Sequence, residues 1–360
     1  MRQLRRDWDC KKMENIAPKD NAYLLGHEEQ EKFILNAWRE HKLHQSLLIS
    51  GPKGIGKATF DYRIARFLLQ ADESKSSNYK SLEVAADDKT FRQVSSGAHP
   101  DFKVVERGYI KTDRQKIYKA VQSGNYMTED ELDNLKKSTE IVVDDVREVN
   151  DFLAKSSADG NWRIVLVDSA DEMNRASANA LLKILEEPPH KTLMLLIAHN
   201  PARLLPTIRS RCAKLELKPL KDNQVASLLR RYRAELSEAE IKKISAMAEG
   251  SIGKAVIYAD GGAVDFYEKM GALIGQGSNF RTGDMLKFCD MAAKDDNYDL
   301  FKEMVVKFLT EQVRRGRNVE QYADLFGKAV QSFREAESLN MDKKQVVTNI
   351  MVALARMEQK

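Results

Sequence analysis

Cysteine is scarce in this chain, and long apolar runs are missing. The three cysteines, Cys10, Cys212 and Cys289, lie far apart and show no CxxC spacing, which argues against a disulfide framework and a cysteine zinc site. The longest apolar run, Leu193 to Ala198, is far shorter than the roughly 20 residues that a membrane-spanning helix needs. We therefore expect reduced thiols and no membrane partner.

A large excess of charge of either sign is missing as well. The 360 residues include 58 basic and 54 acidic side chains, which gives a net charge of +4, so net charge alone does not indicate a nucleic-acid-binding protein. The amino-terminal segment contains several arginines, but Asp7 and Asp9 follow at once and no apolar signal segment appears. We interpret this as a cytoplasmic start.

Apolar segments alternate between strand and helix patterns over the first 200 residues. The expected strands are 46–50, 102–106, 163–168 and 192–199, and the expected helices are 29–43, one that begins near Lys57, 142–153 and 174–187. Strands that alternate with helices imply a mainly parallel sheet. The expected fold class is therefore α/β, with a partly helical surface insertion over 108–140.

The strand signal ends after Pro219. Helical spacing of apolar residues then predicts a small helical unit, which ends near Gly261 and Gly262, and the remainder repeats apolar positions at helical spacing throughout. We predict three domains on this basis. They are an α/β nucleotide-binding-type domain over 1–219, a helical lid domain over 220–262 and an all-helical, oligomerising domain over 263–360.

A glycine-rich loop joins the first expected strand to the helix that follows it. Its residues are Gly51, Pro52, Lys53, Gly54, Ile55, Gly56 and Lys57. Between a strand and a helix, this spacing is typical of a phosphate-binding loop (P-loop), in which backbone N–H groups surround a triphosphate and the lysine reaches its β and γ oxygens. A chance glycine-rich turn is the alternative, and the context disfavours it.

The position after the P-loop lysine departs from that of an active ATPase. A Ser or Thr hydroxyl there ligates Mg²⁺, but this chain has Ala58. Thr59 is no simple replacement, because one step along a helix turns the side chain by about 100°. We count Ala58 and Thr59 among the candidate nucleotide contacts and expect weakened coordination of Mg²⁺.

The expected strand 163–168 ends in Asp168, a carboxylate suited to orient Mg²⁺-bound water. ATPases of this class usually place Glu directly after that Asp, to polarise the attacking water, whereas this chain has Ser169. Asp171 and Glu172 follow in the next turn and remain weaker candidates for the base. Asn200, after the strand 192–199, completes the candidate nucleotide contacts. We expect ATP binding without efficient hydrolysis.

Two further motifs make a family resemblance specific. Residues 179–189 read Asn-Ala-Leu-Leu-Lys-Ile-Leu-Glu-Glu-Pro-Pro, and Ser210-Arg211-Cys212 follows some twenty residues later. Both resemble signatures of bacterial clamp-loader subunits, which are AAA+ proteins. Independently of that family, residues 179–189 predict a helix with an apolar stripe that a proline ends.

The resemblance implies a role for Arg211. In that family the arginine of Ser-Arg-Cys reaches across a subunit boundary to the ATP of a neighbour. A guanidinium stays charged and its rigid fork matches phosphate oxygens, which suits it to stabilise charge during γ-phosphoryl transfer. The alternative for Arg211 is an ordinary surface salt bridge.

Other segments agree with the same family. Leu25-Gly26-His27 resembles the box before its P-loop, and residues 97–101 resemble its Gly-x-His-Pro-Asp turn. A metal role for His99 is disfavoured because no other ligands cluster near it. The zinc-binding cysteine module of many clamp-loader relatives is missing, so we expect no zinc. The resemblance spans about 20–260, and beyond it only the helical pattern resembles the family's collar domain.

The changed positions indicate a type of subunit. Motor subunits of the family carry Thr, Glu and a lid arginine where this chain has Ala58, Ser169 and Gly253, while Arg211 is kept. This pattern resembles the delta-prime type. The resemblance implies a hetero-oligomeric ring with motor subunits and a delta subunit, which loads a sliding clamp onto primed DNA in replication.

Two other functions stay open as alternatives. An active gamma/tau-type motor ATPase is opposed by the three changed positions, and a P-loop enzyme acting on a small molecule would leave the Ser-Arg-Cys motif without a purpose.

Overall fold

The computed structural model describes residues 17–125, 127–128, 131–132, 135–154, 162–277, 281–339 and 341–357. Two units make up the chain: residues 1–228 with 249–253, and residues 229–248 with 254–360. In the described part of the chain, no helix is long and apolar enough to cross a bilayer.

A five-stranded sheet forms the centre of the first unit. Its strands are β1 (Ser46–Ser50), β2 (Phe102–Val105), β3 (Arg163–Val167), β4 (Thr192–Ala198) and β5 (Ala213–Glu216). They lie in the order β2-β3-β4-β1-β5, and every pair is parallel. The expected parallel sheet is confirmed, with β5 as an additional edge strand.

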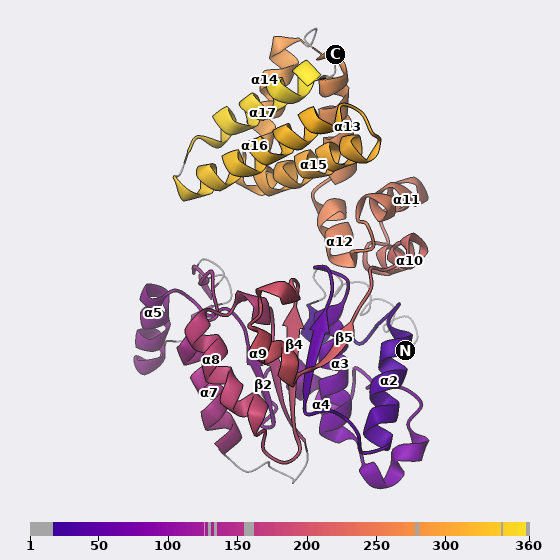
Figure 1. Cartoon of the computed structure of the whole chain (residues 1–360), viewed down its shortest axis with the longest axis vertical. Coiled ribbons are helices and arrows are strands. Elements are labelled where there is room, and N and C mark those ends of the chain that lie inside the picture. Colours follow the sequence, from indigo (N-terminus) through magenta and orange to yellow (C-terminus); the bar gives the residue numbers. More distant parts are fainter. Residues whose placement is uncertain are drawn as a thin grey trace. The chain divides into compact units, whose positions relative to one another are not determined.

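Helices cover both faces of this sheet, because its central strands are apolar on both sides (Figure 1). Along β4, Leu193 and Leu195 pack into one core with α2 (Glu28–Arg39) and α3 (Lys57–Gln70). The alternate residues Met194 and Leu196 pack into a second core with α7 (Val143–Ala154) and α8 (Arg175–Glu186). This period of two is the one expected of a strand buried on both faces.

Shorter elements connect the layers of the first unit. They are η1 (Pro18–Asp20), η2 (Glu73–Asn78), α4 (Lys89–Ser95), α5 (Lys111–Gln122), η3 (Ala170–Glu172), η4 (Pro201–Arg203) and α9 (Pro206–Arg211). Helix α5 lies in the segment 108–140, where a partly helical insertion is expected.

Helices alone form the described part of the chain after β5. They are α10 (Asp222–Tyr232), α11 (Glu238–Met247), α12 (Ile252–Asp260), α13 (Ala263–Gly275), α14 (Thr282–Ala292), α15 (Asp295–Arg314), α16 (Val319–Ser338) and α17 (Lys343–Met357). Buried side chains such as Met270, Phe301 and Met351 form the core of the second unit. The expected fold class, a P-loop α/β domain followed by helical parts, is confirmed, whereas the division into three domains stays a prediction.

Candidate nucleotide-binding site

The carboxyl ends of three neighbouring strands bring the predicted nucleotide contacts to one edge of the sheet. The P-loop 51–57 follows β1, Asp168 follows β3, and Asn200 lies two residues after β4. Because β3, β4 and β1 are adjacent and parallel, these segments share the edge at which open α/β sheets bind ligands.

Glycine permits the shape of the P-loop. Gly51, Gly54 and Gly56 have φ values of 144°, 79° and 101°, in the region that L side chains rarely adopt. The N-terminus of α3 follows at Lys57, with no acidic residue in its first turn. Backbone N–H groups and helix dipole therefore favour an anion at this point.

Lys57 is folded back onto the P-loop. Its Nζ donates hydrogen bonds to the carbonyl oxygens of Gly51 (2.8 Å) and Pro52 (2.6 Å), and the residue is 3% exposed. Burial lowers the pKa of Lys57 to about 8, against the opposing effect of Asp168 and other nearby carboxylates. Triphosphate oxygens in place of the two carbonyls would raise the pKa of Lys57 again, because negative charge nearby favours the charged ammonium.

The neighbours of Lys57 in the loop and helix occupy different environments. Ile55 is 1% exposed, Lys53 is exposed, Ala58 packs partly buried against the core of the α2–α3 side, and Thr59 is buried at 8% exposure. No hydroxyl follows Lys57 directly, so the Mg²⁺ ligand expected of an active ATPase is absent at this position.

His27 supports the P-loop from the preceding segment. The residue is 1% exposed, and its Nε2 lies 2.8 Å from the carbonyl oxygen of Ile55. Burial lowers the pKa of His27, so the neutral ring donates this hydrogen bond through Nε2–H. The Leu25-Gly26-His27 box therefore holds the loop in place.

The segment 250–253 covers the other side of the P-loop within the same unit. Ser251 Oγ donates to the Lys53 carbonyl oxygen (3.0 Å), and the Gly253 N–H donates to the Gly54 carbonyl oxygen (2.9 Å). A Cβ atom at Gly253 would lie 2.9 Å from the Gly54 Cα. A side chain at this position, such as the arginine that motor subunits of the resembled family carry there, would therefore require the P-loop or this segment to shift.

The turn after β3 contains the acidic residues weighed as a catalytic base. Asp171 accepts hydrogen bonds from the backbone N–H groups of His199 (3.0 Å) and Asn200 (2.9 Å), and Glu172 pairs with Arg107 at 3.0 Å. Asp171 therefore positions the end of β4. Both carboxylates have partners other than a nucleotide.

Ser169 occupies the position of the expected glutamate in a left-handed conformation, with φ of 60°. Its Oγ donates to Asp168 Oδ1 at 3.2 Å and lies 3.4 Å from His199 Nε2. A hydroxyl in this place hydrogen-bonds to the Asp168 carboxylate but is a far weaker base than a carboxylate.

Asp61 is a buried carboxylate that sequence reasoning missed. It lies four residues after Lys57 on α3, which puts both on one face of the helix, and this spacing was the available signal. Asp61 is 0% exposed, and neither of its carboxylate oxygens has a hydrogen-bond partner.

Arg211 lies at the opposite edge of the sheet. It ends α9, and Cys212 alone separates it from the start of β5. Arg211 Nη2 pairs with Glu186 Oε1 at 2.7 Å, and Nη1 donates to the Thr207 carbonyl oxygen at 3.0 Å. The side chains of Arg211 and Glu186 are 35% and 48% exposed, so the pair contributes little to stability, on the order of 1 kcal/mol or less.

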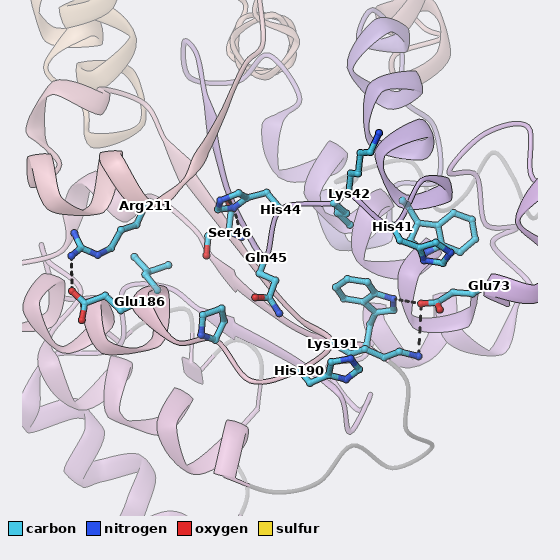
Figure 2. A pocket seen from close by; sticks show the side chains of 15 residues that line it. His41, Lys42, His44, Gln45, Ser46, Glu73, Glu186, His190, Lys191 and Arg211 are labelled. Carbon is cyan, nitrogen blue, oxygen red and sulfur yellow. Dashed lines mark hydrogen bonds and ion pairs between the residues drawn. The ribbon is translucent and has the colours of Figure 1, made fainter.

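A pocket of about 790 Å³ has Arg211 in its lining (Figure 2). Residues that precede strands line it, among them Gln45 before β1, Trp162 before β3 and Lys191 before β4. This pocket therefore lies at the amino edge of the sheet. The structure thus gathers the P-loop, Asp168 and Asn200 at one edge and places Arg211 at the other.

The described residues contain no group of side chains that could form a structural metal site. Among the residues that the structure describes, no three His, Cys, Asp or Glu side chains are grouped so that they could hold an ion. His99 Nδ1 accepts a hydrogen bond from the Asp101 N–H at 3.2 Å, which is a turn role. Cys212 and Cys289 are buried free thiols, and Cys10 lies outside the described residues.

Comparison with known proteins gives concordant matches. A sequence model of the family described as "DNA polymerase III, delta subunit" matches residues 26–221. DNA polymerase III subunit delta' of Pseudomonas aeruginosa is 33% identical over 168 residues, 46% of this chain and 41% of that protein. The subunit delta' of Escherichia coli is 29% identical over 230 residues, 63% and 58% of the two chains.

A subunit with another name matches as well. DNA polymerase III subunit tau/gamma of Haemophilus influenzae is 26% identical over 247 residues, 68% of this chain and 31% of that protein. The matched parts thus cover 31–58% of the three relatives. A solved structure of a gamma-subunit-related protein from Thermotoga maritima aligns over 91% of this chain and 100% of its own, with a TM-score of 0.47 and 17% identity.

Proposed function

This chain belongs to the DNA polymerase III delta subunit family, and from that premise we propose that it is a delta-prime-type clamp-loader subunit that completes a neighbour's ATP site with Arg211. The proposed partners are the gamma/tau-type motor subunits and a delta subunit in one hetero-oligomeric ring. Together they would load a sliding clamp onto primed DNA.

The position of Arg211 carries this proposal. Strand β1 pairs with β5 in parallel, Leu47 opposite Ala213 and Ser50 opposite Glu216. The P-loop begins where β1 ends, whereas Arg211 precedes the start of β5. A five-residue strand at roughly 3.3 Å per residue spans about 16 Å. That separation is too long for Arg211 to reach a phosphate on its own P-loop, so a nucleotide that it contacts must belong to another chain.

The contacts of Arg211 are compatible with such a role. Its partners are a half-exposed carboxylate, Glu186, and one carbonyl oxygen. A triphosphate offers more negative charge and bidentate geometry, which a guanidinium fork binds better than an exposed single carboxylate. Arg211 can therefore exchange Glu186 for a phosphate at a small cost.

The chain's own P-loop supports nucleotide binding without efficient turnover. Gly51, Gly54, Gly56 and Lys57 supply the phosphate-binding geometry, and Mg²⁺ bound with ATP would supply charge neutralisation at the phosphates. No general base is in place, because Ser169 stands where the glutamate is expected and the neighbouring carboxylates are engaged. The same features disfavour the gamma/tau-type motor alternative.

Single-turnover hydrolysis in reconstituted loader complexes tests the proposal. Arg211→Ala should leave assembly intact and slow hydrolysis at the one site it serves by about 10³–10⁵-fold. Bulk ATPase should fall only in part, because other sites have their own arginines. Arg211→Lys should not rescue the rate, since an ammonium lacks the planar fork.

Lys214→Ala is the matched control, because it removes an exposed cation from the adjacent strand β5. Its complex should hydrolyse all bound ATP at the wild-type rate. If the Arg211→Ala complex also did so, Arg211 would have only a structural role and the proposed function would fail.

A further inference from the structure

A fully buried carboxylate without a partner lies beside the P-loop. Asp61 on α3 is 0% exposed, and both of its oxygens lack a hydrogen-bond partner. A buried polar group in this condition destabilises the folded chain, and a charged group does so more strongly. Native proteins usually satisfy such groups, and an ion is one of the partners that can do so.

The helix directs Asp61 toward the position of the missing hydroxyl. Residues 58 and 61 are three apart, so they share one face of α3. Helical side chains point back toward the N-terminus, which brings the Asp61 carboxylate over the turn that contains Ala58. Ala58 has only a methyl group at the point where an active ATPase has a hydroxyl.

A second carboxylate acts on Asp61 from the sheet. Burial and the negative charge of Asp168 raise the pKa of Asp61 well above its ordinary value, and Lys57 opposes this effect. The charge of Asp168 therefore disfavours the charged form of Asp61. A divalent cation would reverse this relation, because it favours the charged form of both.

The number of protein ligands matches one cation in particular. Mg²⁺ is typically held by one or two carboxylates together with phosphates and waters, and seldom by a cage made of protein alone. The described residues offer no cluster of three ligands, whereas two carboxylates at the edge of a P-loop are present. Triphosphate oxygens would complete the octahedron.

We infer that Asp61, together with Asp168, binds the Mg²⁺ of a bound nucleotide and replaces the hydroxyl that Ala58 lacks. This inference rests on the proposed ATP binding. The base for hydrolysis is then missing at Ser169, whereas the metal ligand missing at Ala58 is supplied by Asp61, about one turn further along α3.

Calorimetric titration of the full chain with ATP, in Mg²⁺ and in EDTA, tests this role. Wild-type protein should bind ATP at least about tenfold more tightly in Mg²⁺, the smallest factor expected for loss of a metal-site group. Asp61→Asn, which is isosteric and neutral, should lose this gain. In EDTA it should bind ATP as tightly as wild type, because that buffer leaves no metal for Asp61 to hold.

A loss of affinity confined to the Mg²⁺ buffer distinguishes a metal ligand from a structural residue, whose loss would weaken binding in both buffers. Ala58→Ser combined with Asp61→Asn should regain the Mg²⁺ dependence. Ala58→Ser alone keeps Asp61 and should change the dependence little. A gain of about tenfold or more from this single variant would show that the coordination position was open.

Three further results would overturn the inference. An Asp61→Asn protein that retains the full Mg²⁺ gain would show that Asp168 suffices. Wild-type protein with equal affinity in Mg²⁺ and EDTA would refute the metal role and leave the nucleotide site standing. If the protein bound ATP in neither buffer, the nucleotide site and the metal role would both be refuted, while the Arg211 experiment would be unaffected.

Discussion

The contact between Gly253 and the P-loop allows a quantitative prediction. Gly253→Ala in α12 should gain about 0.5–1 kcal/mol of helix stability, as glycine replacements in helices do. The new Cβ would lie 2.9 Å from the Gly54 Cα, and forcing a methyl group into a packed site costs about 1–3 kcal/mol. We therefore expect a net loss of up to about 2.5 kcal/mol in the free energy of unfolding of the first unit.

Urea unfolding monitored by tryptophan fluorescence measures this loss, because Trp38 and Trp162 both lie in the first unit. Gly271→Ala is the control. Gly271 lies inside α13 of the second unit, and no atom lies within 4 Å of the position that its new methyl group would take. This change should therefore stabilise that unit, as circular dichroism would show. A Gly253→Ala protein that gained stability as well would refute the packing argument.

Two further predictions concern pH. The pKa of Lys57 is about 8 in the free chain, so above that pH the lysine must regain a proton to pair with phosphate. The dissociation constant for ATP, measured by calorimetry, should then rise by up to about tenfold per pH unit, and a constant value up to about pH 9.5 would contradict this. Burial lowers the pKa of His27 from 6.5, so below that pH the unfolded chain binds a proton that folded His27 does not. The free energy of unfolding should therefore decrease as the pH is lowered below 6.5. In urea titrations, His27→Gln should remove the part of this decrease that comes from His27.

Most of the sheet could be predicted because its strands are buried on both faces. β1, β3 and β4 are nearly continuous apolar runs, which makes them visible in the sequence. β5 (Ala213–Glu216) was missed for the opposite reason. It is a four-residue edge strand whose residues alternate between partly buried and exposed, and such a short pattern does not stand out from a loop.

The loop and the carboxylate after β3 could be predicted because local spacing determines them. The contact of Gly253 and the burial of Asp61 could not be predicted, because each depends on tertiary packing. Gly253 contacts Gly54 across about two hundred residues of sequence, and only the folded chain brings them together. Asp61 looks like a solvent-facing residue in the sequence, yet α3 is covered on nearly every side.

The strand that separates the P-loop from Arg211 also explains how a chain can have altered residues at its nucleotide site and still retain Arg211. The P-loop takes its shape from β1, His27 and the segment 250–253, whereas Arg211 is presented by α9 and held by Glu186 on α8. The two sets share no residue, and effects at sites more than about 7–10 Å apart without shared partners usually add independently. Loss of the hydroxyl at position 58 or of the glutamate at 169 therefore puts no strain on the arginine. Under the proposed function, a subunit can therefore lack efficient hydrolysis of its own and still complete a neighbour's site, because Arg211 is held independently of the P-loop.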